Sequence, residues 1–397
     1  MIAVLGVDGG ALPAESAELL ARATLVAGGR RHLDALAPPG AQRVALTGAL
    51  EPALDALAAH EGPACVLASG DPGFYGIVRA LGARVGADAL DVRPAPSSVA
   101  VAFARLGLAW DDALVISGHG RDPHAALAAA LRHPKVAILT APAAPPAWYA
   151  ERLAGSGRML AVAERLGEDD ERLVHGTPEE LARTTFAEPN VLVVLDPAGA
   201  GNGRARVWPP RTPPGWALPD DAFEHRAGMV TKAEVRALAL ARLGPGTGDL
   251  AWDVGCGSGS VAIECARLGA AAIAVDRDPE AVALTARNAA AHGVPVQVVH
   301  GAAPAALGAL PDPDAVFVGG GGPDLDAILD LSCARARRAV VVTLALVERA
   351  GPTLERLGAA GLQAEATMVQ ASRLRPLAGG HRLAAENPIV VVSGVRR

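Results

Sequence analysis

Lysine and aromatic residues are scarce in this chain. Lys135 and Lys232 are the only lysines among 36 basic residues, and phenylalanine, tryptophan and tyrosine together make up 3% of the sequence. The formal net charge is −6. A surface that coats a polyanion needs an excess of basic groups, and base stacking needs aromatic rings. The composition therefore argues against nucleic acid as a partner.

Cysteine is also rare, and long hydrophobic runs are missing. Cys65, Cys256, Cys265 and Cys333 form no CxxC pair and have no histidine at ligand spacing. This pattern supports neither a disulfide framework nor a zinc site. No uninterrupted apolar run approaches the roughly 18 residues that a membrane span requires. We therefore expect a soluble, cytoplasmic chain that binds neither metal nor membrane.

The length of 397 residues predicts two or more domains. Up to residue 206, apolar strands alternate with alanine-rich helices, which is typical of an α/β layer. Several strands are apolar without alternation, which indicates burial on both faces. We expect helices at residues 13–27, 76–86 and 97–106, and strands at residues 2–7, 65–70, 113–118, 135–140 and 190–196.

The composition of the sequence changes abruptly at residues 207–222. They are rich in proline and hold two tryptophans, so they predict a semi-rigid linker and no regular element. The linker separates an expected domain at 1–206 from a second at 223–397. In the second, Thr231 and Glu234 predict a capping box at the start of a helix that ends at Leu243. The later pattern predicts a sheet of seven elements.

The stretch from Leu250 to Asp276 indicates half of a nucleotide-binding α/β unit. An apolar strand, 250–254, leads into a turn with glycines at 255, 257 and 259, then a helix and a strand that ends at Asp276. Glycine lets the backbone lie against a ligand, and the N–H groups of the next helix face that ligand. A carboxylate at Asp276 is placed to accept hydrogen bonds from both ribose hydroxyls.

The spacing in this turn discriminates between nucleotides. A dinucleotide turn reads GxGxxG, but Ser260 stands where the third glycine belongs, and Asp253 lies inside the strand end. The pattern resembles the S-adenosyl-L-methionine site of Rossmann-like methyltransferases, in which the upstream acid helps to hold the methionine end. S-adenosyl-L-methionine is therefore the expected cofactor. An NAD-dependent oxidoreductase is the alternative from another enzyme class.

Two turns before the linker carry a second resemblance. Residues 69–76 read SGDPGFYG and residues 94–99 read PAPSSV. Together they resemble the tetrapyrrole methyltransferases, and the likeness extends to residues 117–121, to Thr140 and to residues 190–195. With HRAGMVTKAEVRALALARL before DVGCGSGSVAIE, the whole chain resembles the fused, decarboxylating methyltransferases of corrin-ring synthesis.

The resemblance implies a fold and a reaction. The fold is α/β, with an N-terminal tetrapyrrole methyltransferase (class III) domain of two α/β subdomains. A C-terminal Rossmann-like class I methyltransferase domain with a seven-stranded, mostly parallel sheet follows. The first domain would methylate carbon 5. The second would methylate carbon 15 and decarboxylate the ring C acetate, which would convert precorrin-6B into precorrin-8.

The resemblance also implies two sets of cofactor contacts. In the C-terminal domain these are Thr231, Asp253, Gly255, Cys256, Gly257, Ser258, Gly259, Asp276 and Ala303. In the N-terminal domain these are Val7, Asp71, Phe74, Ser97, Ser98 and Thr140. Asp8 stands where most members have no acid; of its two possible roles, handling a proton and capping the next helix, we expect capping.

The substrate is expected to react at carbon and to bind through its carboxylates. Strand 314–320 ends in glycines up to Gly322, where amine methyltransferases carry an acidic or NPPY-type motif. A substrate amine therefore has no obvious partner at this position. Arginine forks suit carboxylates, although a GC-rich genome alone would favour arginine. The sequence identifies no catalytic residue. The cation candidates, some on a hairpin expected to turn at Gly379–Gly380, are His119, Arg121, Lys232, Arg373, Arg375, His381 and Arg382.

Three alternatives stay open at this point. The first is a two-domain methyltransferase that acts on another small molecule or on RNA. The second is the oxidoreductase, which predicts thermal protection by NAD instead of S-adenosylmethionine. The third is a tetrapyrrole carrier that binds the ring and releases no S-adenosylhomocysteine. A homo-oligomer is expected under the favoured hypothesis.

Overall fold

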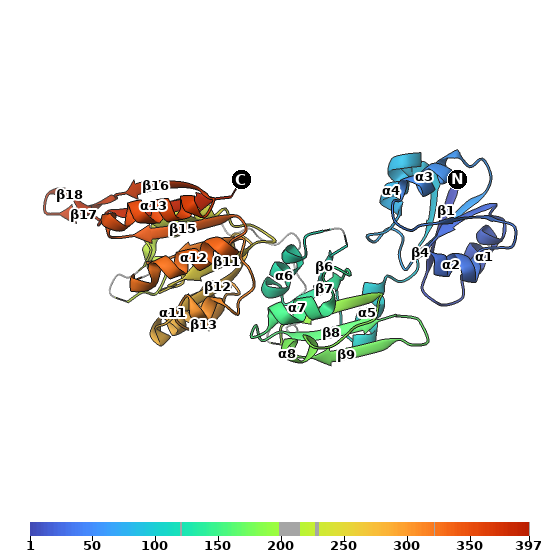
Figure 1. The fold of residues 1–397 in the computed structure, drawn as a ribbon, viewed down its shortest axis with the longest axis horizontal. Helices are drawn as coiled ribbons and strands as arrows, with labels where there is room; N and C mark the ends of the chain where they lie inside the picture. The colour runs from blue at the N-terminus through green and yellow to red at the C-terminus, as the bar shows by residue number, and fades with distance from the viewer. Residues whose placement is uncertain (120, 198–214, 227–229, 321, 397) are drawn as a thin grey trace. The chain divides into compact units, whose positions relative to one another are not determined.

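The chain forms two compact units. The computed structural model describes residues 1–119, 121–197, 215–226, 230–320 and 322–396 (Figure 1). The first unit consists of Met1–Arg121, Ala137–Ala147 and Met159–Leu195, and the second of Asp122–Val136, Trp148–Arg158 and Asp196–Arg397. Residues 207–214 of the expected linker lie outside the described residues. Within the described ranges, no helix is both long enough and apolar enough to span a membrane.

The first unit begins with a parallel sheet of five strands in the order β3-β2-β4-β1-β5. Along β1, Ala3 and Leu5 pack on one face with α1 and α2, while Ile2 and Val4 pack on the other with α3 and α4 (Figure 1). The bounds are β1 Ile2–Val7, β2 Leu25–Gly28, β3 Gln42–Ala45, β4 Ala64–Ser69, β5 Leu90–Arg93, α1 Ala14–Ala21, α2 Arg30–Leu36, α3 Glu51–Ala59 and α4 Val78–Val85. Burial on both faces explains the unbroken apolar runs.

The helix expected at residues 13–27 is wrong in its extent. Helix α1 ends at Ala21, and Leu25–Gly28 forms strand β2 between β3 and β4. The backbone N–H of Thr24 donates to the carbonyl of Pro63 at 2.8 Å, which starts the pairing with β4. A short apolar run fits a buried strand as well as a helix, and only the sheet decides between them.

A second sheet of five strands completes the first unit, in the order β6-β7-β10-β8-β9. Strand β8 is antiparallel to both β10 and β9. Val99, Ala102 and Phe103 of α5 pack against this sheet. The bounds are β6 Leu114–Ser117, β7 Lys135–Leu139, β8 Met159–Glu164, β9 Arg172–Gly176, β10 Asn190–Leu195, α5 Ser98–Leu106 and α8 Pro178–Leu181. The two sheets confirm the expected fold of two α/β subdomains.

Ser97 caps helix α5, and its replacement should destabilise that helix. Its Oγ accepts a hydrogen bond from the backbone N–H of Ala100 at 3.2 Å. We expect Ser97→Ala to lower the free energy of opening of α5 by about 1 kcal/mol, and Ser97→Gly by only a few tenths of that. Native-state hydrogen exchange of the α5 amides measures both. Equal losses for the two variants would contradict a capping role.

The second unit is built around a seven-stranded sheet in the order β13-β12-β11-β14-β15-β19-β16. The five strands from β13 to β15 in this order, which are β13, β12, β11, β14 and β15, are parallel. Strand β19 runs antiparallel to its neighbours β15 and β16. This confirms the expected Rossmann-like, mostly parallel sheet. The strands are β11 Leu250–Val254, β12 Ala271–Asp276, β13 Gln297–His300, β14 Ala315–Val318, β15 Ala339–Leu344, β16 Gln363–Val369 and β19 Ile389–Val395.

Helices cover both faces of this sheet. On β11, Trp252 faces α12 and α13, whereas Ala251 faces α9 and α10. The helices that pack on it are α9 Ala233–Leu243, α10 Ser260–Arg267, α11 Pro279–Ala291, α12 Leu325–Arg335 and α13 Ala350–Ala359, and α6 Pro123–Arg132 and α7 Pro146–Leu153 precede them in the chain. The strand order reverses between β11 and β14, and such a switch point opens a crevice at the carboxyl ends of the strands. The glycine-rich turn follows β11 at this crevice.

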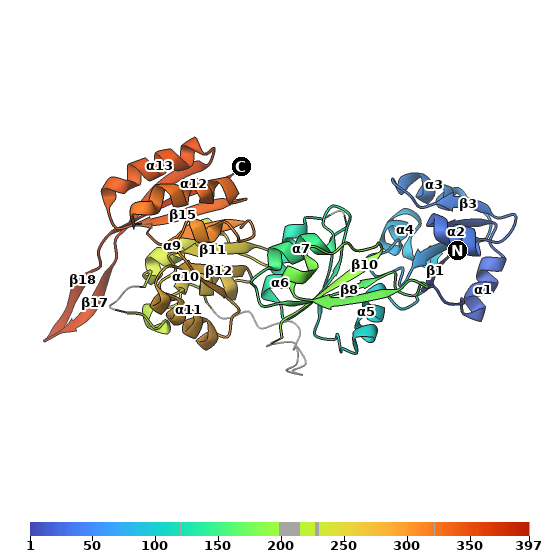
Figure 2. The same ribbon diagram turned by 60° about the horizontal axis from the view of Figure 1, so that its bottom comes forward.

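The expected hairpin is present, with its turn one residue earlier. Strands β17 (Ser372–Leu377) and β18 (Gly380–Ala385) form a two-stranded sheet that projects from the second unit (Figure 2). Because Leu377 pairs with Gly380, the turn residues are Ala378 and Gly379, and Gly379 has φ +79°. Glycine adopts this left-handed conformation without steric cost.

Candidate functional sites

The turn after β11 has a backbone that only glycine adopts easily. Gly255, Gly257 and Gly259 have φ values of +73°, +56° and +74°. A Cβ atom on Gly259 would lie 2.5 Å from Cγ2 of Thr285, so a side chain there has no room. A Cβ atom on Gly257 would meet nothing within 4 Å. The turn is packed against α11 on one side and open where a ligand can approach.

Asp276 lies beside this turn at the end of β12. Its Oδ2 accepts a hydrogen bond from the N–H of Gly257 at 3.0 Å, and its Oδ1 accepts one from the N–H of Asp278 at 2.9 Å. Each carboxylate oxygen can accept a second hydrogen bond. The side chain is half-buried. The carboxylate is thus oriented by the backbone and keeps acceptor capacity for a ligand hydroxyl.

Asp253 is buried beneath the start of α10. Its Oδ2 accepts a hydrogen bond from the N–H of Ala262 at 2.9 Å, while its Oδ1 has no partner among the described residues. Burial raises the pKa of Asp253 to about 7, and the neighbouring Asp276 contributes in the same direction. The acid therefore fastens α10 to the strand end and presents one buried oxygen without a partner.

The raised pKa of Asp253 predicts a pH dependence. The unfolded carboxyl releases its proton near 3.8 and the folded one near 7, so the folded state holds more protons between these values. The stabilisation is complete below about pH 4 and is lost as pH rises through 7. We expect Asp253→Asn, which keeps the acceptor for Ala262, to weaken this fall in stability. Urea unfolding of both proteins at pH 5 and pH 8 measures it, and parallel pH profiles would contradict the assignment.

The other cofactor contacts expected in this domain are Cys256, Ser258, Ala303 and Thr231. Cys256 and Ser258 are buried within the turn, and Sγ of Cys256 lies 3.4 Å from Oγ1 of Thr285. Ala303 follows β13 and is partly buried. The expected capping box at Thr231 is wrong, because α9 begins at Ala233 and Oδ1 of Asp220 accepts the N–H of that residue at 2.8 Å. An acid from the end of the expected linker replaces the local cap.

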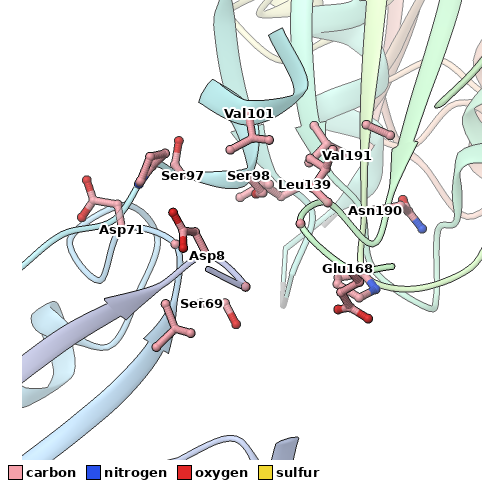
Figure 3. Close-up of a pocket in the computed structure, with 18 of the residues that line it drawn as sticks. Asp8, Ser69, Asp71, Ser97, Ser98, Val101, Leu139, Glu168, Asn190 and Val191 are labelled. Atoms are coloured by element: carbon pink, nitrogen blue, oxygen red, sulfur yellow. The ribbon is translucent and has the colours of Figure 1, made fainter. Parts of the chain in front are cut away.

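A cavity of about 1120 Å³ lies between the two sheets of the first unit. Figure 3 shows Asp8, Asp71 and Ser97 on one side and Glu168 and Asn190 on the other. The six cofactor contacts expected in this domain all line the cavity: Val7, Asp71, Phe74, Ser97, Ser98 and Thr140. The fold therefore brings together residues spread over more than a hundred positions.

Close backbone packing shapes this cavity. A Cβ atom on Gly6 would lie 2.3 Å from both the nitrogen of Ala95 and the carbonyl oxygen of Gly70, so only glycine fits where strand β1 meets the loops after β4 and β5. Oδ1 of Asp71 accepts the N–H of Gly73 at 2.8 Å. Thr140 is buried, and its Oγ1 donates to Oδ1 of Asn190 at 2.5 Å. These bonds fix the loops that form the wall.

Asp8 does not cap a helix. Its Oδ1 accepts the N–H of Gly10 at 3.1 Å, whereas α1 starts only at Ala14 and follows Pro13. The carboxylate therefore closes a local turn at the cavity wall. Ala11, Leu12 and Pro13 separate Gly10 from the helix, and Pro13, which has no backbone N–H to donate and favours a helix start, stands directly before Ala14.

Cation candidates occur in both units. His119 lines the cavity, and the guanidinium carbon of Arg121 lies 5.5 Å from the ring centroid of Tyr75. In the second unit, Arg373 is bound by Asp220 at 2.9 Å and by Glu234 at 2.8 Å, and these acids raise its pKa. The protein's own carboxylates therefore occupy Arg373.

The remaining cation candidates differ in exposure. Nζ of Lys232 lies 3.7 Å from Oδ2 of Asp220, which also partly neutralises this lysine. Arg375, His381 and Arg382 are exposed on the hairpin, and Arg375 pairs across the strands with Arg382. Two cations on neighbouring positions repel one another and favour an anionic partner. In the described part of the chain, His, Cys, Asp and Glu form no cluster that could hold a metal.

Sequence reasoning missed Thr285 and Asn288, which hold the turn from α11. Oγ1 of Thr285 donates to the carbonyl of Gly257 at 3.1 Å, and Nδ2 of Asn288 donates to the carbonyl of Ser258 at 2.8 Å. Two polar residues three positions apart on an otherwise alanine-rich helix share one face. That spacing was the available signal, but it did not reveal what the face contacts.

Known families match both parts of the chain. The model of the tetrapyrrole (corrin/porphyrin) methylases matches residues 5–182, and the model of the precorrin methyltransferase domain matches residues 221–396. A precorrin-6Y C(5,15)-methyltransferase [decarboxylating] of Sinorhizobium sp is 40% identical over 342 residues, which cover 82% of this chain and 79% of that protein.

Two further matches cover about half of the chain. A probable cobalt-precorrin-6B C(15)-methyltransferase (decarboxylating) of Pyrobaculum calidifontis is 39% identical, over 47% of this chain and 98% of that protein. The solved structure of a precorrin 8W decarboxylase of Methanobacterium thermoautotrophicum is 34% identical with a TM-score of 0.43, over 45% of this chain and 98% of that one.

Proposed function

Because the chain belongs to the family of decarboxylating precorrin-6Y C(5,15)-methyltransferases, we propose that it methylates carbons 5 and 15 of precorrin-6B and yields precorrin-8. Each reaction has a separate site in this proposal. Domain 1–206, with the cavity, methylates carbon 5. Domain 223–397 methylates carbon 15 and removes carbon dioxide from the ring C acetate. The observation that supports the proposal is that one methyltransferase chain holds both a cavity in its first unit and a separate glycine-rich turn in its second.

S-adenosyl-L-methionine is the proposed methyl donor at both sites. At the second site, the open side of Gly257 and the remaining acceptor capacity of Asp276 suit a nucleoside. The unpartnered Oδ1 of Asp253 provides a buried acceptor beside the same turn. At the first site, Asp71, Ser97 and Thr140 would hold the donor. The donor supplies an electrophilic methyl group, and transfer leaves a neutral thioether.

Glycines at the end of β14 suit a carbon nucleophile. A Cβ atom on Gly319 would lie 2.8 Å from the carbonyl oxygen of Gly255, so this position excludes a side chain that could orient an amine. An electron-rich enamine-like carbon attacks the methyl group directly, and the protein must align the two reactants and exclude water. Bond formation at carbon 15 leaves an iminium-like system beside the acetate. The electron pair of the carbon–carboxylate bond then neutralises it as carbon dioxide leaves.

The substrate's carboxylates are proposed to bind exposed cations. Arg375, His381 and Arg382 serve this role at the second site, and His119 and Arg121 at the first. Lys232 and Arg373 are weaker candidates because internal acids pair with them. We place the reaction in the cytoplasm and expect a homo-oligomer, which mass photometry of the full chain would test.

Incubation with precorrin-6B and methyl-labelled S-adenosylmethionine tests the proposal. Mass spectrometry should find a product with two labelled methyl groups and without one carboxyl carbon. A product that keeps the acetate would refute the decarboxylase assignment. Thermal protection by NAD without protection by S-adenosylmethionine would favour the oxidoreductase alternative.

A further inference from the structure

Helix α11 holds two consecutive carbonyl groups of the glycine-rich turn. Thr285 and Asn288 donate to the carbonyls of Gly257 and Ser258, and their side chains are 0% and 4% exposed. A peptide unit is planar and trans, so a carbonyl held on one side fixes the N–H of the same unit on the opposite side. Thr285 therefore sets the direction of the N–H of Ser258, whereas the N–H of Gly259, in the unit held by Asn288, donates to the carbonyl of Cys256 at 2.8 Å and closes the turn.

Asn288 also binds the segment at the C-terminal end of the expected linker. Its Oδ1 accepts the N–H of Glu224 at 2.9 Å, and its Nδ2 also donates to the carbonyl of Glu224 at 2.8 Å. Next to it, Phe223 is buried, and its ring centroid lies 4.9 Å from that of His292. We call residues 218–224 the strap. One amide side chain thus joins the strap to the turn.

The other end of the strap is fixed in the same unit. The N–H of Leu218 donates to Oε1 of Glu264 at 2.6 Å, and Oδ1 of Asp220 accepts the N–H of Ala233. The strap therefore contacts Ala233 at the start of α9, Glu264 of α10 and Asn288 of α11. Its contacts are those of an integral part of the second unit, although residues 218–222 read as linker in the sequence.

We propose that Thr285 and Asn288 are positioning residues for the methyl donor at the second site, and that Asn288 makes the strap part of the same support. This inference rests on the proposed function of the turn. Neither side chain touches the reacting atoms, so their loss weakens donor binding and leaves the chemical step nearly intact. The expected signature is a raised KM for S-adenosylmethionine with little change in kcat.

The test uses the full chain with precorrin-6B and measures carbon dioxide release against S-adenosylmethionine concentration. Thr285→Val keeps the shape and removes the hydroxyl, and we expect its KM to rise roughly tenfold with kcat within about twofold. Thr285→Ser restores the hydroxyl and should restore the KM. Asn288→Asp loses both donated bonds and should raise the KM at least as much. Thr353→Val, at a buried threonine of α13, is the matched control and should keep the normal KM.

The possible failures are distinguishable. If the unaltered chain releases no carbon dioxide with S-adenosylmethionine, the proposed function fails. If it is active and Thr285→Val keeps the normal KM, the positioning role is wrong. The role is also wrong if Thr285→Ser fails to restore the KM, or if Thr353→Val raises it equally. Methylation at carbon 5 by the same molecules shows that each variant is folded in its first unit.

Discussion

Asp276→Ala should abolish methylation at carbon 15 and carbon dioxide release while methylation at carbon 5 continues. The variant has no carboxylate for the two proposed ribose contacts. Two charge-assisted hydrogen bonds are worth roughly 3 kcal/mol together, or about 100-fold in affinity for the donor. The backbone N–H groups of Gly257 and Asp278 would also lose their acceptor, which loosens the turn itself. The expected product of one incubation is a precorrin with one added methyl group and an intact acetate.

The reciprocal change and a surface control complete this prediction. Asp71→Ala removes the acceptor for the N–H of Gly73 at the cavity wall and should abolish methylation at carbon 5 only. Asp326→Ala alters an exposed aspartate of α12 that pairs with Arg356, and both activities should persist. Mass spectrometry counts methyl groups and carboxyl carbons in each product. If Asp276→Ala or Asp71→Ala removed both activities from a folded protein, the division of labour between the domains would be wrong.

Strands β1, β4, β7 and β10 were predictable because strands buried on both faces have few polar positions, whereas β5, β8 and β9 were not predicted. All six residues of β1 are buried, and its run IAVLGV needs no alternation to be recognised. Strand β3 escaped prediction because three of its four residues are exposed and it has no apolar run. Strand β2 was absorbed into a predicted helix because a four-residue apolar run carries no period of its own.

The sites divide in a similar way. Gly255, Gly257 and Asp276 were predictable as a group because one short α/β unit holds them at fixed spacing. Contacts made by tertiary packing were not. The pairing of Arg373 with Asp220 and Glu234 depends on where the hairpin starts relative to α9, and no local pattern encodes that position. The link of Thr285 to the turn depends on which face of α11 packs inward.

Glu264→Gln should strongly destabilise the second unit, because it removes the buried carboxylate that pairs with a buried arginine. Arg236 and Glu264 are both fully buried, with Nε of Arg236 at 3.5 Å from Oε1 of Glu264. The guanidinium also donates to the carbonyls of Leu218 and Thr231 and lies 4.7 Å from the ring centroid of Phe223. Breaking a buried pair by removing one partner costs about 3–5 kcal/mol.

Two comparisons separate the buried charge from a general loss of an ion pair. Glu365→Gln breaks the exposed pair with Arg242, and such a surface pair contributes at most about 1 kcal/mol. Arg236→Met combined with Glu264→Leu removes both buried charges, and apolar replacement of a whole pair restores much of the stability. Urea unfolding followed by hydrogen exchange in β11 and α10 reports on the second unit alone. If Glu264→Gln cost no more than Glu365→Gln, the pair would not be what fastens the strap to α9 and α10.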